Sequence, residues 1–205
     1  MKVLVACEFS GRVRDAFRAR GHDAVSCDVL PSMTAGPHLQ CDVRDVLDDG
    51  WDMLVAFPPC DHLASSGSAW WTRKRASGEQ RAAIEFFVTL AEASIPRICV
   101  ENPKGILTRP YRPPDQHIEP FEFGEPYVKG TYLWLRNLPP LQPSNVVTPE
   151  HRWIGGDASA GYGLHRNPML RSLTFQGVAD AMAEQWGVLE PLSTMDCYSQ
   201  PTLGF

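Results

Sequence analysis

The sequence lacks any long apolar run, and this absence excludes a transmembrane helix. No stretch of about 18 apolar residues occurs, and a membrane-spanning helix needs about that length. The chain begins with a strand-like apolar run and shows no charged leader or small-residue cleavage site of a signal peptide. We therefore expect a cytoplasmic protein that makes no membrane contact.

Paired cysteines and zinc-binding spacings are also missing. The six cysteines are scattered, with no C-x-x-C pair and no Cys/His cluster at zinc spacing. This pattern predicts reduced thiols and no metal site. Four of these cysteines lie in or beside short apolar runs, where the residue packs as a small core side chain: Cys7, Cys27, Cys41 and Cys99. Cys60 does not fit that description.

Positive charge is scarce. The net charge is −5 and the isoelectric point is about 5.7. Proteins that hold a long nucleic-acid duplex usually present a basic face, because phosphate contacts dominate their affinity. The charge balance disfavours a protein that grips a long duplex by itself, but it is compatible with a local basic surface.

Strand-like and helix-like patterns alternate along the first half of the chain. We expect strands or short elements at 2–7, 23–28, 42–47, 51–57 and 97–100, and helices at 11–20, 79–93 and 178–187. This order predicts a doubly wound, Rossmann-like α/β sheet. Such sheets bind ligands beyond the carboxyl ends of their strands, and several chemically versatile residues follow those ends: Glu8, Asp28, Asp42, Cys60 and Glu101.

Proline and glycine are dense between residues 107 and 170. We expect irregular structure there around one strand pair, with the clearest strand at 132–135. The sequence therefore divides into a sheet domain at 1–137, a short Pro/Gly-rich region at 138–177, and a part at 178–205. That last part holds the final helix, which completes the sheet domain, and a tail.

Two prolines and a cysteine follow the expected strand at 51–57. Pro58 and Pro59 fix the backbone and remove two amide donors, so Cys60 is held at a rigid turn. A reactive thiol needs exposure and surroundings that favour the thiolate, and His62 could supply such surroundings or face solvent. A buried cysteine after a tight turn is the alternative interpretation.

Glu101, Asn102 and Pro103 follow the expected strand at 97–100. The proline pushes Asn102 into an extended conformation, so Glu101 would project from the strand end. Taken alone, Glu101 is as well explained as an exposed carboxylate or a contributor to a helix cap.

Together these segments resemble the signature motifs of the cytosine-C5 methyltransferase family. Residues 58–67 resemble its catalytic Pro-Pro-Cys-Gln segment, with Asp61 in place of Gln. Residues 101–103 resemble its Glu-Asn-Val. Residues 123–131 are similar to its Tyr-Gly-x-Pro-Gln-x-Arg-x-Arg, in which Lys129 and Thr131 replace the two arginines.

The segment after the first strand resembles the cofactor loop of the same family, Phe-x-Gly-x-Gly. Residues 8–11 are Glu-Phe-Ser-Gly, and Val13 stands where the second glycine is expected. The resemblance covers roughly residues 1–137, and the final helix at 178–187 shows a weaker resemblance. Small phage-type members lacking a full target-recognition domain look closest, which for localisation implies the cytoplasm of a bacterial host.

The resemblance implies S-adenosylmethionine-dependent methyl transfer to C5 of cytosine through a covalent adduct with Cys60, with DNA favoured as the substrate. Protonated Glu101 would hydrogen-bond N3 of the base, which needs a raised pKa. Lys129 would contact a phosphate or the base edge, or be a solvated turn residue. Residues 1–137 would be the catalytic, cofactor-binding domain and 138–177 a reduced recognition region.

The resemblance also implies residues for the cofactor and the substrate. Cofactor-binding candidates are Phe9, Ser10, Gly11, Asp28, Asp42 and Pro58. Substrate-binding candidates are Pro59, Ser65, Ser66, Asn102, Trp70, Arg73, His165 and Arg166. Asp28 would accept from the ribose hydroxyls and Asp42 would face the adenine amino group, although either carboxylate could instead cap a helix or be solvated.

Two of these substrate candidates carry alternatives of their own. Trp70 and Arg73 place an aromatic beside a basic run, which suits nucleic-acid contact but also suits a packed tryptophan and a solvated charge. His165 and Arg166 could bind a phosphate or cap the final helix.

The gap left for reading DNA is short. Residues 138–177 are 40 positions, whereas even small specific DNA modules bury on the order of 600 to 1,000 Å². The alternatives are therefore C5 methylation of a free cytidine nucleotide such as CMP or dCMP, with Lys129, His165 and Arg166 at the phosphate, or an inactive nucleotide-binding or DNA-binding relative. A homodimer or a partner subunit could supply further recognition.

Overall fold

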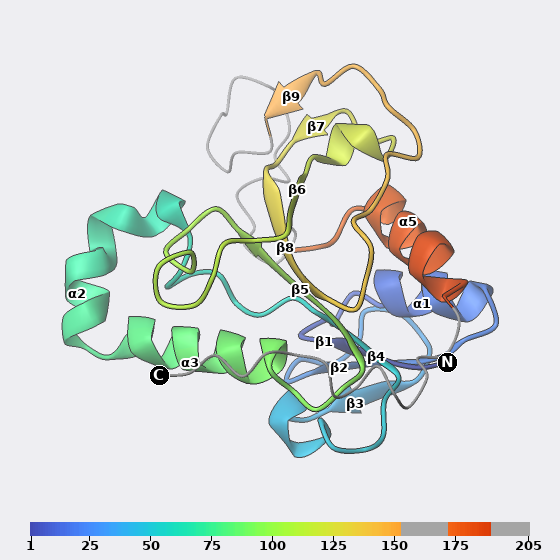
Figure 1. The fold of residues 1–205 in the computed structure, drawn as a ribbon, viewed down its shortest axis with the longest axis horizontal. Coiled ribbons are helices and arrows are strands. Elements are labelled where there is room, and N and C mark those ends of the chain that lie inside the picture. The colour runs from blue at the N-terminus through green and yellow to red at the C-terminus, as the bar shows by residue number, and fades with distance from the viewer. Residues whose placement is uncertain (153–171, 190–205) are drawn as a thin grey trace.

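The computed structural model describes residues 1–152 and 172–189 (Figure 1). Within these residues a seven-stranded sheet has the order β3-β2-β1-β4-β5-β8-β6. Its strands are β1 (Lys2–Ala6), β2 (Asp23–Asp28), β3 (His38–Gln40), β4 (Met53–Ala56), β5 (Arg97–Pro103), β6 (Gln116–Ile118) and β8 (Thr131–Arg136). A small second sheet pairs β7 (Tyr127–Val128) with β9 (His151–Arg152).

Helices cover both faces of the large sheet, so the doubly wound α/β prediction is confirmed. The α-helices are α1 (Arg12–Ala19), α2 (Trp71–Ala76), α3 (Glu79–Ala91) and α5 (Gln176–Gly187), and the 3-10 turns are η1 (Val43–Asp45), η2 (Ser65–Trp70) and η3 (Pro120–Glu122). None of the helices described is long and apolar enough to cross a bilayer.

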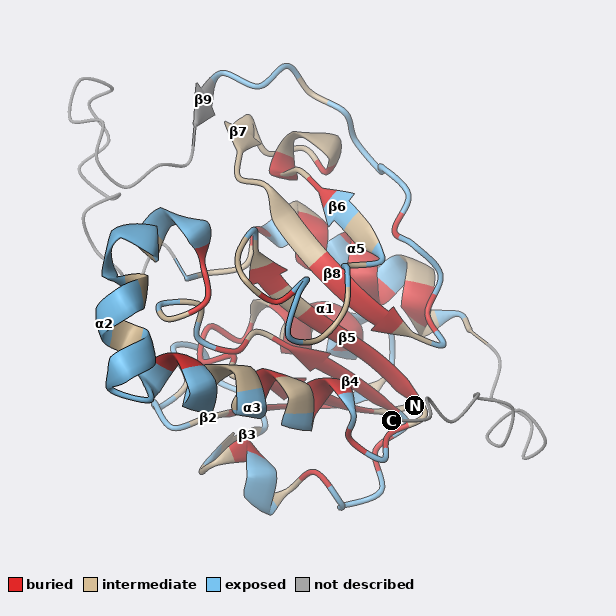
Figure 2. Cartoon of the chain, turned by 60° about the vertical axis from the view of Figure 1, so that its left-hand side comes forward, coloured by how far each residue is buried: buried red, intermediate tan, exposed pale blue. Residues whose placement is uncertain are grey.

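Alternate residues of the central strands pack against different helices. Val3, Val5 and Val55 belong to the core that includes α1 and α5, whereas Leu4 and Ala56 belong to the core beneath α3. Successive side chains of a strand point to opposite faces, and a strand covered on both faces needs a continuous apolar run. The buried centre in Figure 2 follows from this pattern.

The third strand lies earlier than the sequence predicted. β3 is His38–Gln40, and residues 42–47 contain the 3-10 turn η1 instead of a strand. The Asp42 carboxylate accepts a hydrogen bond from the Arg44 amide at 3.0 Å, which caps a helical turn. β3 is short, polar and at the sheet edge, so no apolar alternation marked it.

β5 is longer than predicted and continues through Glu101 and Asn102 to Pro103. The extension exists because β8 pairs with it antiparallel, placing Glu101 opposite Leu133 and Asn102 opposite Tyr132. β8 inserts between β5 and β6, so the strand expected at 132–135 belongs to the large sheet. Glu101 therefore lies within a hydrogen-bonded strand rather than beyond its end.

Candidate active site

The candidate site lies at the edge of the sheet where the parallel strands β1, β2, β4 and β5 end (Figure 1). The loop after β1 carries Glu8, β2 ends at Asp28, and Cys60 follows β4. Burial, and then the charge of Asp28, raises the pKa of Cys7 to about 12. The ends of the neighbouring strands β1 and β2 thus bring the Cys7 thiol and the Asp28 carboxylate close enough to influence each other.

Cys60 lies in a turn that two strands position. Its carbonyl accepts hydrogen bonds from the amides of Leu63 (3.0 Å) and Ala64 (2.9 Å). The Asn102 side-chain amide donates to the Pro58 carbonyl at 3.1 Å, which ties the loop to β5. Asn102, expected to contact the substrate, is instead fully buried and acts on the loop that carries the cysteine.

The surroundings of Cys60 favour the neutral thiol. Burial raises its pKa to about 11, and the carboxylates of Glu101 and then Asp61 add to that rise. Lys129 is the cation that lowers it, a role for which the sequence had suggested His62. The sequence interpretation required surroundings that favour the thiolate, whereas burial and the two carboxylates act in the opposite direction.

Glu101 and Lys129 are the charged residues of one largely apolar pocket. The pocket is lined by Phe57, Glu101, Ile118, Pro120, Lys129, Thr131, Ser172, Thr174, Phe175, Val178 and Met182. Burial raises the pKa of Glu101, and the nearby Lys129 opposes the rise. A carboxyl with a raised pKa can keep its proton and donate a hydrogen bond, as the sequence interpretation required.

Lys129 is held by the turn before β8. Its backbone amide donates to the Glu119 carboxylate at 2.8 Å, and Glu119 also lies 3.3 Å from His117. The Lys129 ammonium lies 5.6 Å from the centre of the Phe175 ring. Glu101 and Lys129, predicted as catalytic from separate segments, thus line one pocket, and the charges of both influence the pKa of Cys60; the catalytic roles stay predictions.

The loop between β1 and α1 satisfies the first amides of the helix with its own side chains. Glu8 Oε1 accepts from the Ser10 hydroxyl at 2.5 Å and from the Val13 amide at 3.3 Å, and Ser10 Oγ accepts from the Arg12 amide at 3.2 Å. Glu8 is only 4% exposed, and burial raises its pKa. Sequence reasoning gave Glu8 no role, although an acidic residue between an apolar strand and a helix was a usable signal.

The remaining acidic cofactor candidates, Asp28 and Asp42, differ in how many hydrogen bonds and ion pairs their carboxylates already make. Asp28 is half-buried at the end of β2 and accepts from the Leu30 amide at 2.9 Å. Asp42 caps η1 and pairs with Arg44, whose hydrogen bond lowers the pKa of that carboxyl to about 2. Asp42 thus has the capping role that competed with adenine binding, and its adenine contact stays a prediction.

Several substrate candidates lie on an arm formed by η2 and α2, which we call the 65–76 arm. Ser65, Ser66, Trp70 and Arg73 are exposed, and so is Pro59. The Arg73 guanidinium lies 5.0 Å from the centre of the Trp70 ring. The sequence gave no helix for this arm, which carries no apolar face. His165 and Arg166 lie outside the described residues.

The sheet, with helices on both faces, is a doubly wound, Rossmann-like α/β arrangement. No group of His, Cys, Asp and Glu suited to a metal ion occurs in the ranges that the structure describes. Fold alone does not define activity, so the chemistry of the site carries the functional argument.

The chain was also compared with known proteins. Comparison with models of protein families gave no match, and neither did comparison with curated proteins. Among solved structures, a similar chain is provisionally described as a DNA modification methyltransferase encoded within a prophage of E. coli, with a TM-score of 0.46 and 14% identity. The match covers 71% of this chain and 51% of that chain, so this chain spans about half of its length.

Proposed function

We propose that the protein transfers a methyl group from S-adenosylmethionine to C5 of a cytosine, with Cys60 as the nucleophile. The observation that carries this proposal is the cluster of Cys60, Glu101 and Lys129. Glu101 raises the pKa of Cys60, and Lys129 lowers the pKa of both. A nucleophile, a proton donor and a cation are the groups that addition to a pyrimidine ring requires.

The reaction begins with the Cys60 thiolate adding to C6 of the ring. A C–S bond forms, the C5–C6 double bond opens, and electron density moves toward C5 and N3. Glu101 in its protonated form donates a hydrogen bond to N3 and stabilises that density. C5 would then take the methyl group from the sulfonium of S-adenosylmethionine, whose sulfur would leave as a neutral thioether. A base then removes the C5 proton, the double bond re-forms, and Cys60 is expelled as a thiolate.

Protonation of Glu101 also helps Cys60 to ionise. The Glu101 carboxylate is one cause of the raised pKa of Cys60, so a neutral Glu101 removes that repulsion. The proton on Glu101 and the negative charge on Cys60 therefore favour each other. Interacting groups of this kind titrate as a pair, and Lys129 favours the thiolate form of that pair.

The residues beside α1 fit a cofactor without phosphate. A dinucleotide normally places its pyrophosphate at the N-terminus of the first helix, but here Glu8 and Ser10 already accept from those amides. S-adenosylmethionine supplies an electrophilic methyl group and carries positive charge, which suits nearby carboxylates. Asp28 would hold the ribose, while Phe9, Ser10, Gly11 and Pro58 would form the adjoining wall.

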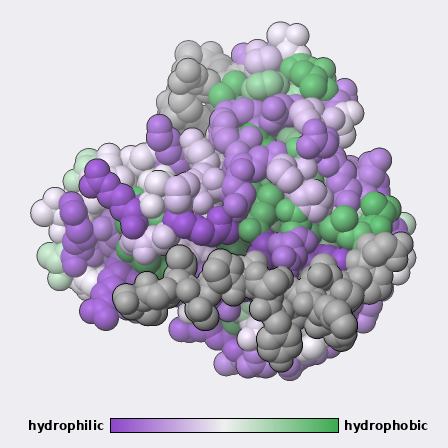
Figure 3. Space-filling model, in the orientation of Figure 1, coloured by the Kyte–Doolittle hydropathy of each residue, from purple (hydrophilic) through white to green (hydrophobic). Residues whose placement is uncertain are grey.

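The 65–76 arm supports DNA as the substrate. Trp70 is the last residue of η2 and is 56% exposed. Arg73 and Arg75 follow on α2 and are also exposed, and hydrophilic side chains gather in this part of the molecule, at the left of Figure 3. An exposed aromatic beside arginine can stack on a base while the cation meets the phosphate backbone. The arm begins a few residues after Cys60, so a nucleic acid reaching the cysteine would pass close to it.

A free cytidine nucleotide is the second candidate substrate. The net charge of −5 favours it, because a small ligand needs no extended basic face. Among the residues that the structure describes, Lys129, which lines the same pocket as Glu101, is the cation that would bind the phosphate of the nucleotide. An inactive relative is disfavoured because the cluster of Cys60, Glu101 and Lys129 is complete.

A methyl-transfer assay tests the proposal. Radiolabelled S-adenosylmethionine is offered with duplex DNA, single-stranded DNA, CMP or dCMP, and we expect label on a cytosine substrate. Cys60→Ala should abolish transfer, while Cys99→Ala, a buried thiol in β5, should retain most of it. Absence of label from every cytosine substrate, or transfer by Cys60→Ala, would contradict the proposal.

A trapping experiment tests the covalent step directly. A substrate with fluorine at C5 has no proton to lose at that carbon, so the bond from Cys60 to C6 should persist after methylation. Intact-mass measurement under denaturing conditions should show the adduct on Cys60 in the wild type. The same mass shift at another cysteine would assign the nucleophile elsewhere.

A further inference from the structure

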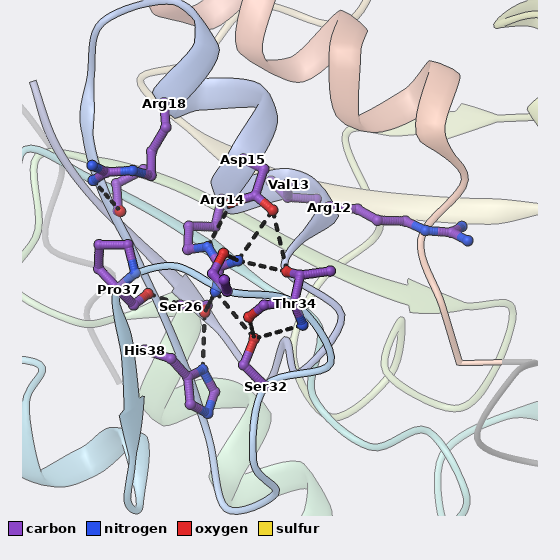
Figure 4. Close-up of polar contacts among 12 residues, drawn as sticks. Arg12, Val13, Arg14, Asp15, Arg18, Ser26, Ser32, Thr34, Pro37 and His38 are labelled. Atoms are coloured by element: carbon purple, nitrogen blue, oxygen red, sulfur yellow. Dashed lines mark hydrogen bonds and ion pairs between the residues drawn. The ribbon is translucent and has the colours of Figure 1, made fainter.

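Arg14 on α1 is fully buried, although it carries a charge. Its side chain has 0% exposure, and it points from the helix toward the loop between β2 and β3 (Figure 4). Burying a guanidinium is costly unless it is paired and hydrogen-bonded. Asp15 provides a two-point pair, with Nε at 2.8 Å from Oδ1 and Nη2 at 3.1 Å from Oδ2.

The remaining donors of Arg14 all reach the β2–β3 segment. Nη1 donates to Ser26 Oγ at 3.0 Å and to Ser32 Oγ at 3.2 Å. Nη2 donates to Thr34 Oγ1 at 2.7 Å and to the Ala35 carbonyl at 3.1 Å. Residues 29–37 form no helix or strand, so these bonds replace the backbone ladder that would otherwise fix their shape.

Two glycines leave the space that the guanidinium fills. A Cβ added to Gly11 would lie 2.4 Å from Arg14 Nη2, and one added to Gly36 would lie 2.8 Å from it. Gly11 belongs to the loop after β1 and Gly36 to the loop after β2. The arginine therefore lies between the two loops that would hold the cofactor.

The two loops are also joined directly. The Met33 amide donates to the Phe9 carbonyl at 2.7 Å, and the Thr34 hydroxyl lies 3.3 Å from the Ser10 carbonyl and 3.2 Å from Asp15 Oδ2. Arg14 thus completes one hydrogen-bonded unit that includes the loop after β1, the 29–37 loop and the first turn of α1.

The 29–37 loop of this unit exposes apolar side chains to solvent directly after Asp28. Val29 is 69% exposed, Leu30 is 43% exposed and Met33 is 54% exposed. A cluster of exposed apolar side chains is a common mark of a ligand or partner site. A nucleoside matches this surface, because its flat base can cover the apolar side chains while its hydroxyls meet the carboxylate of Asp28.

We propose that Arg14 is a positioning residue for the nucleoside part of the cofactor, acting through the 29–37 loop. The inference rests on the proposed function, since it assumes that S-adenosylmethionine binds this edge. Arg14 does not touch the cofactor. It fixes the loop so that Asp28 and its apolar neighbours keep the spacing that the nucleoside requires.

Calorimetric titration with S-adenosylmethionine tests the inference without any methyl acceptor. Arg14→Lys keeps the charge but loses the planar fork, and we expect it to weaken binding by about tenfold or more. Thr34→Val removes one acceptor from the exposed side of the network and should weaken binding severalfold. Arg18→Lys is the matched control, because that arginine lies on the same helix and is exposed.

The kinetic signature separates positioning from a general loss of structure. At saturating S-adenosylmethionine the kcat of Arg14→Lys and Thr34→Val should stay near that of the wild type, while KM for this cofactor rises. If Arg14→Lys fails to fold, as judged by circular dichroism, Thr34→Val carries the test. Wild-type affinity in the folded variants would overturn the role of Arg14, whereas a wild-type protein that does not bind S-adenosylmethionine would overturn the proposed function.

Discussion

Lys129 is the residue whose charge opposes the effect of burial at both Cys60 and Glu101. Lys129→Met should raise the pKa of Cys60 and so lower the thiolate fraction at any pH below that pKa. The measurement is the rate of Cys60 alkylation by iodoacetamide as a function of pH, with the modified peptide identified by mass spectrometry.

Lys129→Arg is the matched control, because it keeps a cation at the same position. Its alkylation profile should stay close to that of the wild type, while the profile of Lys129→Met moves to higher pH. Superimposable profiles for all three proteins would show that Lys129 does not influence the thiol.

At the scale of single residues, the sequence named these three residues and required a raised pKa for Glu101, but it did not predict the raised pKa of Cys60. Cys60, Glu101 and Lys129 could be named from local motifs, since each motif is a few residues long. Their pKa shifts depend on burial by segments distant in sequence, including the residues of α5 that line the pocket. Arg14 gave no signal for a similar reason, because its partners are serines and a threonine in an irregular loop.

Asn102 joins two elements, because its side-chain amide in β5 donates to the Pro58 carbonyl in the loop after β4. Asn102→Ala leaves a buried carbonyl without this partner, which costs about 1–3 kcal/mol. We expect a melting temperature lower by several degrees and a reduced kcat, because the loop that carries Cys60 loses its anchor.

Gln142→Ala is a suitable control for Asn102→Ala. Gln142 also donates from a side-chain amide to a proline carbonyl, that of Pro140 at 3.3 Å, but it does so at the surface. Its replacement should leave both the melting temperature and kcat nearly unchanged. A stable Asn102→Ala protein with normal kcat would show that the anchor is dispensable.

The 65–76 arm provides a prediction for nucleic-acid binding. Trp70→Ala removes a surface on which a base can stack, an interaction worth about 1–3 kcal/mol, so affinity for a short DNA should fall about tenfold. Arg73→Ala should also weaken binding and reduce its dependence on salt, because a phosphate contact releases counterions. Fluorescence anisotropy at several salt concentrations measures both effects.

Arg81→Ala serves as the control for the arm, since Arg81 is an exposed helical arginine that pairs with Glu85 on α3. Its DNA affinity should match that of the wild type. If the arm variants bind DNA normally but lose activity on a free cytidine nucleotide, the second candidate substrate gains support.

The elements that the sequence predicted well are those with a strong apolar pattern. β1, β2, β4 and α3 appear within a few residues of their expected ranges. Burial on both faces of the sheet imposes apolar runs on the strands, and packing on one side imposes an apolar face on the helix. β3 was missed because a polar edge strand carries little pattern. The extension of β5 depends on pairing with β8, which follows it by about thirty residues. A pairing between such distant segments cannot be predicted from the local sequence pattern.

The stability of the whole molecule should depend on the ionisation of Glu101. Burial raises its pKa in the folded state, so the folded protein holds this proton to higher pH than the unfolded chain does. Stability is then greatest below the ordinary carboxyl pKa and is lost as pH rises toward the folded-state pKa. Glu101→Gln cannot ionise and should be more stable than the wild type at neutral pH.

Guanidinium denaturation between about pH 5 and pH 8 measures this effect, because the difference between wild type and variant should grow with pH. Glu85→Gln, at an exposed position on α3, should show no such growth. Glu101→Gln should also lose methyl transfer, since an amide cannot supply the proton. If Glu101→Gln were less stable than the wild type at every pH, the ionised Glu101 carboxylate would stabilise the folded protein, which contradicts the prediction.

The carboxylate of Glu8 also limits how this scaffold could be redesigned. Helix N-termini are natural receptors for anions, and many α/β proteins use the first one to hold a phosphate. Here the Ser10 hydroxyl and the Glu8 carboxyl already accept hydrogen bonds from the first amides of the helix, so a phosphate could bind there only by displacing them. Converting this protein to bind a dinucleotide would require emptying that position first, which makes Glu8 the first residue that an engineer would have to replace.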